Sequence, residues 1–339
     1  MRKRRFVVQS RLSKILRSSA VGVAVLALLA GCSSNADDTD ADSTSTGNSA
    51  FPVSIEHEFG TTTIDDVPER IVTLGVTDAD IVLALGTVPV GNTGYKFFEN
   101  GLGPWTDELV EGKELTLLDS DSTPDLEQVA ALEPDLIIGV SAGFDDVVYE
   151  QLSDIAPVVA RPAGTAAYAV AREEATNLVA RAMGQSEKGQ ELNEETDALI
   201  QAAREENPSF DGKTGTVILP YQGKCGAYLP GDARGQFLDS LGISLPEAVL
   251  SRDTGDSFFV DVPAESVKDV DGDVLLVLSN DENLDITAEN PLFETLNVVQ
   301  KDAVIVATTE ERGAITYNSV LSVPFALEHL APRIAEALK

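Results

Sequence analysis

One long polar segment near the middle of the chain constrains the fold more than any other feature. Residues 186–207, SEKGQELNEETDALIQAAREEN, predict a helix, because Ser186 can cap its start, Pro208 follows its end, and apolar positions recur at a helical period. The apolar stripe is narrow and consists of Leu192, Thr196, Leu199 and Ala203. A helix of this length spans roughly 31 Å and is too polar to be buried all round, so we expect it to bridge two lobes.

Strand and helix signals alternate on both sides of this segment. In the first half, a hairpin is predicted at 53–64, strands at 71–75, 88–90, 136–139 and 158–160, and helices at 78–85, 125–132, 146–153 and 168–183. In the second half, strands are predicted at 216–220, 258–262, 274–279 and 304–308, and helices at 236–241, 264–270 and 327–338.

Unbroken apolar strands that alternate with helices indicate parallel sheets covered on both faces. The predicted fold class is therefore α/β, with two Rossmann-like lobes of parallel sheet joined by one long helix. The N-terminal lobe would span 51–185, the bridging helix 186–207 and the C-terminal lobe 208–339. Because ligands of such sheets bind at the carboxyl ends of the strands, two facing lobes predict a cleft for a small molecule.

The N-terminus carries an export signal. A basic segment precedes an apolar run at 20–30 that is too short to cross a bilayer, so residues 1–31 are predicted to be a signal peptide. Leu29-Ala30-Gly31-Cys32 resembles the lipobox of bacterial lipoproteins, which implies that Cys32 is acylated and becomes the first residue of the mature chain. The alternative is a plain secretory signal with an incidental Cys.

Residues 32–50 continue with Ser, Thr, Asp and Gly and have no large apolar side chain, so they predict a disordered acidic tether. We therefore expect an exported protein that the lipid on Cys32 anchors to the outer face of the cell membrane, without a spanning segment. Cys225 is left as an odd thiol and is expected to be buried or loosely protected.

The charge excludes one class of partner. The chain has 56 acidic and 24 basic residues, a formal charge of −32, and loss of the seven cations in residues 1–31 would lower it to −39. Nucleic acid is therefore not expected as a partner, because binding it requires clustered cations. Solubility explains most of the acids.

Four segments resemble the substrate-binding lipoproteins of ABC importers for ferric siderophores, haem and cobalamin. They are VPERIVTLGVTDADIVLALGTVPVG at 67–91, TPDLEQVAALEPDLIIG at 123–139, YEQLSDIAPVV at 149–159 and AESVKDVDGDVLLVLS at 264–279. The resemblance covers about residues 60–339 and implies a class III substrate-binding fold, in which one rigid helix joins the lobes.

The same resemblance implies a binding protein and not an enzyme. A monomer would capture an iron(III)-siderophore complex and deliver it to a permease dimer and its ATPase. A phosphate loop of the G-x-x-x-x-G-K-[ST] kind does not occur in the sequence, so the energy would come from that ATPase.

The resemblance also implies two docking residues. In this family one Glu on each lobe pairs with Arg on the two permease subunits, and the matching positions here are Glu127 in DLEQVAAL and Glu265 in PAESVKDV. Such pairs fix register and speed the encounter more than they add affinity.

Ligand residues vary within the family, so the candidates are chosen by chemistry. Ferric siderophores are often anionic and present aromatic or hydroxamate oxygens, so the cleft should collect Arg, Lys, Tyr and Trp. The candidates in loops or after strands are Tyr95, Lys96, Trp105, Arg161, Tyr221, Lys224, Tyr228, Arg234, Arg312 and Tyr317. Neither a resident metal nor a cofactor other than the lipid on Cys32 is expected.

Other ligands and one enzyme are the alternatives. Haem is possible because Tyr alone can ligate its iron, whereas the single Trp disfavours cobalamin. Residues 139–143, GVSAG, fit the G-x-S-x-G motif of a serine hydrolase with Ser141 as nucleophile, but the only downstream His, His329, falls in the closing helix of the other lobe. A carrier of bare transition metal would need more imidazoles than His57 and His329 supply.

Overall fold

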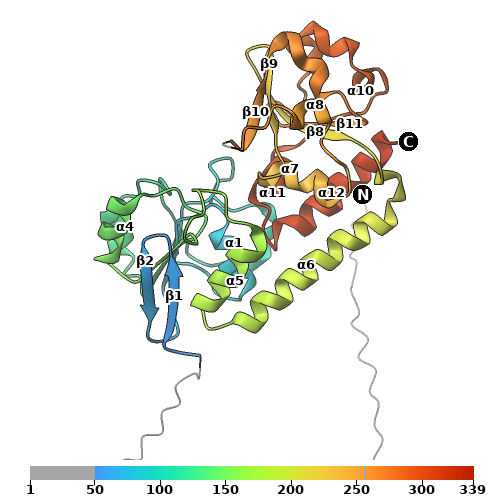
Figure 1. Cartoon of the computed structure of the whole chain (residues 1–339). Helices are drawn as coiled ribbons and strands as arrows, with labels where there is room; N and C mark the ends of the chain where they lie inside the picture. Colours follow the sequence, from blue (N-terminus) through green and yellow to red (C-terminus); the bar gives the residue numbers. More distant parts are fainter. Residues whose placement is uncertain (1–49, 256) are drawn as a thin grey trace, which may run out of the picture. The chain divides into compact units, whose positions relative to one another are not determined.

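The structure, a computed structural model, describes residues 50–255 and 257–339. The predicted signal peptide, Cys32 and all of the predicted tether except Ala50 lie outside these residues. The described residues belong to one unit of the chain, Gly47–Lys339. Within this unit two α/β lobes are joined by one long helix, as the sequence predicts (Figure 1).

The first lobe is built on a five-stranded sheet in which all neighbouring strands are parallel. Its strand order is β5-β4-β3-β6-β7, and the strands are β3 Ile71–Thr73, β4 Gly91–Asn92, β5 Thr116–Leu117, β6 Leu136–Gly139 and β7 Val158–Ala160. Its helices are α1 Asp78–Ala84, α2 Asp107–Val110, α3 Leu126–Ala131, α4 Asp146–Ser153 and α5 Arg172–Ala182, with a 3-10 helix, η1, at Pro104–Thr106. An antiparallel hairpin of β1 Val53–His57 and β2 Gly60–Ile64 precedes the sheet.

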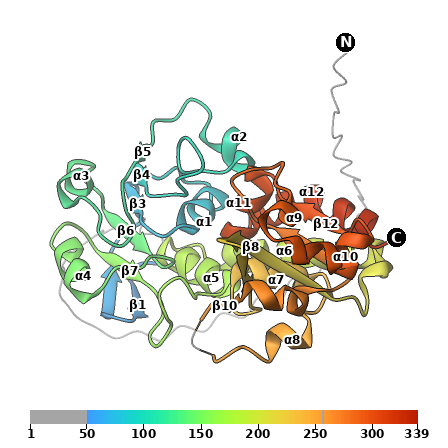
Figure 2. The ribbon, with the colours of Figure 1, turned by 90° about the horizontal axis from the view of Figure 1, so that it is seen from above.

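Both faces of this sheet are buried, because its strands are apolar throughout. Ile71 packs with the hairpin, α1 and α5, whereas its neighbour Val72 packs with α3 and α4 on the opposite face. Figure 2 shows α3 and α4 on one side of the strands and α1 and α5 on the other. The loops that follow β3, β4, β6 and β7 are therefore left at the carboxyl edge of the sheet.

Helix α6, Ser186–Glu206, connects the lobes. Its first half contacts the first lobe, where Gly189 approaches Ala180 of α5 so closely that a Cβ on Gly189 would lie 2.4 Å from the Ala180 Cβ. Its second half packs Ile200 and Ala203 against the core of the second lobe. Two details differ from the prediction. The N-cap position is Gln185 and not Ser186, and the Gln185 side chain makes no capping hydrogen bond. Leu199 of the predicted apolar stripe is 46% exposed, because Ile200 faces the core.

The second lobe has a mixed sheet, not the parallel sheet that the sequence predicts. In the order β10-β9-β8-β11-β12, strands β8 Gly215–Tyr221, β11 Val274–Val277 and β12 Val304–Val306 are parallel, and β9 Lys224–Tyr228 and β10 Phe259–Val262 are antiparallel to their neighbours. The predicted loop around Lys224 is strand β9. Gln222 and Gly223 both have positive φ, as a two-residue hairpin turn requires, so the chain folds straight back after β8.

Helices cover this second sheet as well. They are α7 Ala233–Ser240, α8 Glu247–Leu250, α9 Ile286–Glu289, α10 Asn297–Gln300, α11 Thr309–Tyr317 and α12 Ser322–Ala337, with 3-10 helices η2 Pro208–Phe210, η3 Ala264–Val270 and η4 Pro291–Thr295. Two buried clusters lie on the opposite faces of the sheet, with Leu276 in one and Leu275 in the other.

The bounds or types of several other elements differ from the prediction, four of them in ways that the structure explains or that change the element. The strand expected at 88–90 is β4 at Gly91–Asn92, and the helix expected at 168–183 begins at Arg172 because Tyr168 has a φ of +64°. The helix at 264–270 is of the 3-10 type, and α12 begins at Ser322, whose backbone N–H and hydroxyl both bond with Ser319. Among the described residues, none of the helices combines the length and the apolar character that a membrane span requires.

Candidate functional site

A cavity of about 260 Å³ lies between the two lobes. The first lobe lines it with loops at the carboxyl ends of its strands: Thr77 follows β3, Tyr95 follows β4, Ser141 follows β6 and Tyr168 follows β7. The second lobe lines it with residues 231–234, Gln236, Phe258 and residues 316–319. The cavity is thus where the topology of the first sheet predicts a ligand.

Arg234 is the cationic centre of the second lobe's wall. Arg234 is the second residue of helix α7, which begins at Ala233. The Asp232 side chain caps this helix by accepting from the Arg234 backbone N–H. The guanidinium donates from Nε to Asp232 Oδ1 at 2.7 Å and from Nη2 to Asp232 Oδ2 at 2.6 Å. It also lies 4.0 Å from the ring centroid of Tyr228, to whose hydroxyl Nη1 donates at 3.1 Å. Arg234 is therefore held rigidly, with its charge matched by a carboxylate.

Aromatic side chains from both lobes meet beside this arginine. The ring centroids of Tyr95 and Tyr317 are 5.9 Å apart, and the Tyr317 hydroxyl donates to the Gly101 carbonyl across the lobes at 2.5 Å. Arg312 of α11 lies 4.4 Å from the ring centroid of Phe97 and donates to Asn280. Five predicted ligand residues, Tyr95, Tyr228, Arg234, Arg312 and Tyr317, thus lie in or beside the cavity.

The phenols of the cavity remain protonated at neutral pH. Burial, reinforced by the Asp121 carboxylate, raises the pKa of Tyr168 to about 12. Burial also raises the pKa of Tyr228, and it raises the pKa of Tyr317 well above its ordinary value of 10.0. These side chains are therefore neutral phenols and not phenolates, and the single O–H of Tyr317 is already donated to the Gly101 carbonyl.

Ser141 has a structural partner in place of a catalytic base. Its hydroxyl donates to Asp78 Oδ1 at 2.5 Å, and its backbone N–H donates to the same oxygen at 3.0 Å. The rings of His57 and His329 bond instead to the Thr62 hydroxyl and the Phe325 carbonyl. The arrangement therefore lacks the Ser–His contact of a hydrolase among these residues.

The glycines of the G-x-S-x-G motif also have packing roles. A Cβ on Gly139 would lie 2.2 Å from the Phe144 ring, and one on Gly143 would lie 2.0 Å from the Tyr168 hydroxyl. Both glycines make room for neighbouring side chains, and Gly143 lets Tyr168 reach the cavity.

The other predicted ligand residues lie elsewhere. Lys96 is exposed and lines a separate hollow of about 530 Å³ together with Glu99 and Asp119. Tyr221 and Lys224, at the tip of the β8–β9 hairpin, both bond to Asp261.

Arg161 is used inside the first lobe. Its guanidinium donates to the carbonyls of Phe144 and Thr165, each at 3.1 Å, and lies 4.8 Å from the ring centroid of Phe59. It does not line the inter-lobe cavity.

Trp105 lies in a contact between the lobes and does not line the cavity. Its indole Nε1 donates to Asp80 Oδ2 at 2.8 Å, and its ring packs 5.3 Å from that of Tyr317. The Ser319 hydroxyl of the second lobe donates to the same Asp80 oxygen. Burial raises the pKa of Asp80 to about 7, although the bonds from Ser319 and Trp105 lower it. This contact closes one side of the cavity, which Tyr317 and Ser319 also line.

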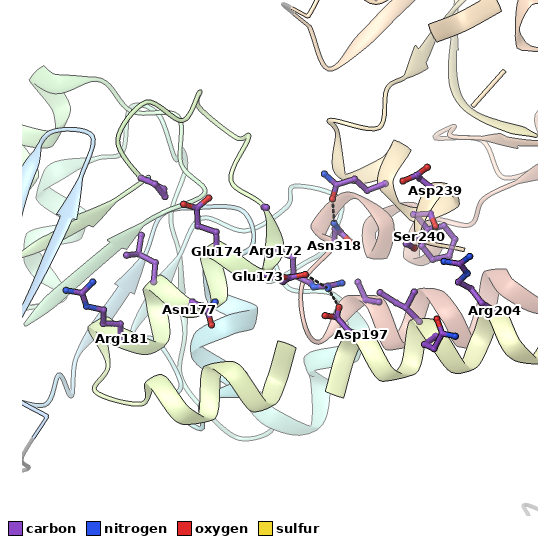
Figure 3. A pocket seen from close by; sticks show the side chains of 18 of the residues that line it. Arg172, Glu173, Glu174, Asn177, Arg181, Asp197, Arg204, Asp239, Ser240 and Asn318 are labelled. Carbon is purple, nitrogen blue, oxygen red and sulfur yellow. Dashed lines mark hydrogen bonds and ion pairs between the residues drawn. The ribbon is translucent and has the colours of Figure 1, made fainter. Parts of the chain in front are cut away.

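A second cavity, of about 980 Å³, lies beside helix α6 (Figure 3). Its lining mixes Arg172 and Arg181 of α5 with Asp197 and Arg204 of α6, and Arg172 is paired with Asp197. The two cavities share three lining residues, Arg172, Gln236 and Asn318. The Asn318 amide donates to the Gln236 side chain at 3.1 Å, which links α7 to the corner between α11 and α12.

The two predicted docking residues occupy equivalent local positions. Glu127 is exposed in the first turn of α3, and Glu265 is exposed in the first turn of η3. Each carboxylate is therefore accessible and lies near a helix N-terminus, where negative charge is stabilised.

Several residues that line the inter-lobe cavity were not among the predicted ligand residues. Tyr168 was assigned to a helix, and Arg172 and Phe258 were not singled out. Asp232 carries a readable signal, because an Asp directly after Pro-Gly and before a helix is a typical N-cap. Among residues 50–255 and 257–339, groups of three or more His, Cys, Asp or Glu that could hold a metal ion are not found.

Comparison with known proteins gives consistent relationships. Residues 71–311 match the sequence model of the periplasmic binding protein family. A probable siderophore-binding lipoprotein of Bacillus subtilis is 30% identical over 253 residues, 73% of this chain and 74% of the relative. An Fe(3+)-citrate-binding protein of the same organism is 25% identical over 295 residues, 86% of this chain and 89% of the relative. A Streptococcus pneumoniae protein, PiaA, solved in complex with ferrichrome, has a TM-score of 0.73 at 27% identity and covers 84% of this chain and 98% of its own.

Proposed function

The chain belongs to the periplasmic binding protein family, and from this premise we propose that it captures a ferric siderophore between its lobes and delivers it to an ABC permease for iron uptake. The observation that carries the proposal is the cavity at the carboxyl ends of the first sheet, bounded by Tyr95, Tyr168, Arg234 and Tyr317. Neutral phenols and a fixed guanidinium supply hydrogen-bond donors for the oxygens that surround chelated iron.

The same donors favour a chelate over haem. A Tyr that ligates haem iron does so as phenolate, and burial raises the pKa of Tyr168, Tyr228 and Tyr317. The two His residues bond to other groups, His57 to Thr62 and His329 to the Phe325 carbonyl. A siderophore brings its own iron ligands, so it needs only hydrogen-bond partners and apolar contact from the protein.

Binding is tested by calorimetric titration of the purified full-length chain with ferric siderophores, iron-free siderophores and haem. We expect saturable binding of at least one ferric chelate and a rise in unfolding temperature, since a ligand at 100 times its Kd stabilises the fold by about 2.7 kcal/mol. Trp105 fluorescence should change as well, because its ring packs against Tyr317, which lines the cavity. Binding of haem together with failure of every ferric chelate to bind would refute the proposal.

Delivery is proposed to depend on Glu127 and Glu265, which would pair with cationic residues of a permease dimer. Each carboxylate is exposed and lies outside the cavity, so Glu127→Arg and Glu265→Arg should leave chelate affinity unchanged and lower iron uptake by cells. Glu247→Arg, at an exposed first-turn Glu of α8, makes the same charge change and is the matched control. If both docking variants transport iron as well as the control does, the docking assignment is wrong.

Export and anchoring complete the proposal. Cys32 would carry the lipid that holds the protein at the outer face of the cell membrane, and residues 32–50 would be its tether. Cys32→Ser should release the protein from the membrane fraction while its affinity for the chelate is retained. Membrane retention of this variant would point to another anchor.

A further inference from the structure

The charges around the inter-lobe cavity are almost fully balanced, which bears on the class of siderophore that it can hold. Of the described residues that line the cavity, the charged ones are Arg172, Asp232 and Arg234. Arg234 is bound by both oxygens of Asp232, and the Asp232 side chain is only 7% exposed, so water does not screen this pair.

Arg172 also has an acidic partner, although the side chain of this partner is 51% exposed. Its Nη2 is paired with Asp197 of α6, and its side chain is 11% exposed. Neither lining arginine therefore offers an unmatched positive charge to a ligand.

One cation beside the cavity differs from these two. Arg312 lies over the ring of Phe97 and bonds to the neutral side chain of Asn280. Among the described residues, Arg312 has no carboxylate within 4.0 Å, so its charge is not matched by an ion pair.

Carboxylates lie beside the cavity as well, since Asp78 and Asp80 accept from the lining residues Ser141 and Ser319. The described residues of the cleft therefore supply no surplus of cations that could match a trianion.

Ferric siderophores divide by charge. Three hydroxamates bring one negative charge each, so their Fe³⁺ complex is neutral, whereas three catecholates bring two each and leave a trianion. A trianion that entered this cavity would lose its hydration without meeting matching cations, which is unfavourable. A neutral complex would lose far less hydration and needs only hydrogen-bond donors.

The cavity supplies such donors without net charge. A guanidinium has five N–H groups, and Arg234 uses three of them on Asp232 and on the Tyr228 hydroxyl. The remaining N–H groups can donate to hydroxamate oxygens, and Tyr95 and Tyr168 line the cavity from the first lobe.

Building on the proposed function, we propose that this cleft selects ferric chelates by charge, taking neutral or singly charged hydroxamate complexes and rejecting tris-catecholate trianions, with the Asp232–Arg234 pair as the determinant. Sequence similarity does not decide this point, since the relatives' names include ferric citrate as well as ferrichrome. The preference for a neutral chelate follows because both arginines that line the cavity, Arg172 and Arg234, already have an acidic partner.

The test is calorimetric titration of the full-length chain with ferrichrome and with ferric enterobactin. We expect ferrichrome to bind at least about 100-fold more tightly. Asp232→Asn should lower the ratio of the affinity for ferrichrome to the affinity for ferric enterobactin by about tenfold or more. The main effect should be tighter binding of the trianion, because the substitution leaves the positive charge of Arg234 without its acidic partner. The affinity of Asp232→Asn for the trianion should fall as salt is added, whereas its affinity for neutral ferrichrome should not depend on salt.

The variant is suited to the purpose because Asn is as good an N-cap as Asp, so α7 should keep its start. Asp285→Asn, at the exposed N-cap of α9, removes the same charge away from the cavity and should leave the ratio unchanged. The inference is overturned if the wild type binds the trianion as tightly as ferrichrome, or if Asp232→Asn leaves the ratio unaltered. If the whole panel of ferric chelates fails to bind, the proposed function itself falls, which is a separate outcome.

Discussion

The buried carboxylate of Asp80 should make the stability of the protein depend on pH, and Asp80→Asn should remove that dependence. Asp80 Oδ2 accepts from the Trp105 indole and the Ser319 hydroxyl, while Oδ1 is buried without a partner. Burial is the largest cause that raises its pKa from the ordinary 3.8 to about 7. The unpartnered oxygen is consistent with an acid that is easier to keep neutral than charged.

The sign of the effect follows from proton linkage. A carboxyl group whose pKa is higher in the folded than in the unfolded state binds its proton more tightly when folded. Its cost to stability is absent below pH 3.8, grows as the pH rises, and is complete above about pH 7. The displacement of the pKa from 3.8 to about 7 corresponds to about 4 kcal/mol, of which about 2 kcal/mol falls between pH 5.5 and pH 8.0.

The assay is urea unfolding of the wild type and Asp80→Asn at pH 5.5 and at pH 8.0. The substitution also changes packing, but the resulting change in the free energy of unfolding does not depend on pH. It therefore cancels when the difference between variant and wild type is compared at the two pH values. We expect the free energy of unfolding of the variant minus that of wild type to be about 2 kcal/mol larger at pH 8.0 than at pH 5.5, so that the variant is relatively more stable at the higher pH. Ser319→Ala keeps the titrating carboxyl group and removes a bond that lowers its pKa, so this variant should lose at least as much stability as wild type between pH 5.5 and pH 8.0. An equal difference between Asp80→Asn and wild type at both pH values would refute the reasoning.

Two further predictions concern buried groups near the cleft and in the second sheet. Tyr317→Phe should lower the free energy of unfolding by about 1 kcal/mol, measured by urea titration, because it removes the hydroxyl that donates to the Gly101 carbonyl and leaves that carbonyl only the Tyr95 backbone N–H. No change would mean that water replaces the hydroxyl. Burial and, to a smaller extent, Asp261 raise the pKa of the Cys225 thiol to about 12. A disulfide reagent should therefore label Cys225 slowly in the folded protein and rapidly in urea. Fast labelling of the folded protein at pH 8 would contradict this burial.

Elements with strong local signals could be predicted from the sequence. Strand β6 and helix α4 lie where they were expected, at Leu136–Gly139 and Asp146–Ser153. Both combine an apolar run or period with clear boundaries, and α4 is capped by Asp145, which accepts from the Val148 N–H. Helix α11 was missed although Thr308 and Glu311 form a capping box that can be read in the sequence.

The site was harder to predict than the fold, because it joins residues that are distant in the chain. Tyr95 and Arg234 come from different lobes, and only the pairing of the lobes brings them to one cavity. Residue chemistry alone could not show that Arg234 lines the cavity and Arg161 does not. The Arg161 guanidinium instead donates to two backbone carbonyls of its own lobe. The backbone of Tyr168 could not be read either, because its positive φ depends on contacts made after folding.

The inter-lobe cavity is small, and movement of the lobes would give a chelate more room. Its volume of about 260 Å³ is below the roughly 300–1,000 Å³ of typical ligand sites. Helix α6 packs Leu192 on the core of the first lobe and Ile200 on that of the second, so it would resist bending, and small displacements of the lobes would enlarge the cavity. Such displacements would stretch the bond between Asp80 and Ser319, which crosses from one lobe to the other. Ligand entry and this buried contact should therefore be coupled, and a substitution that weakens the contact should also alter the affinity for the chelate.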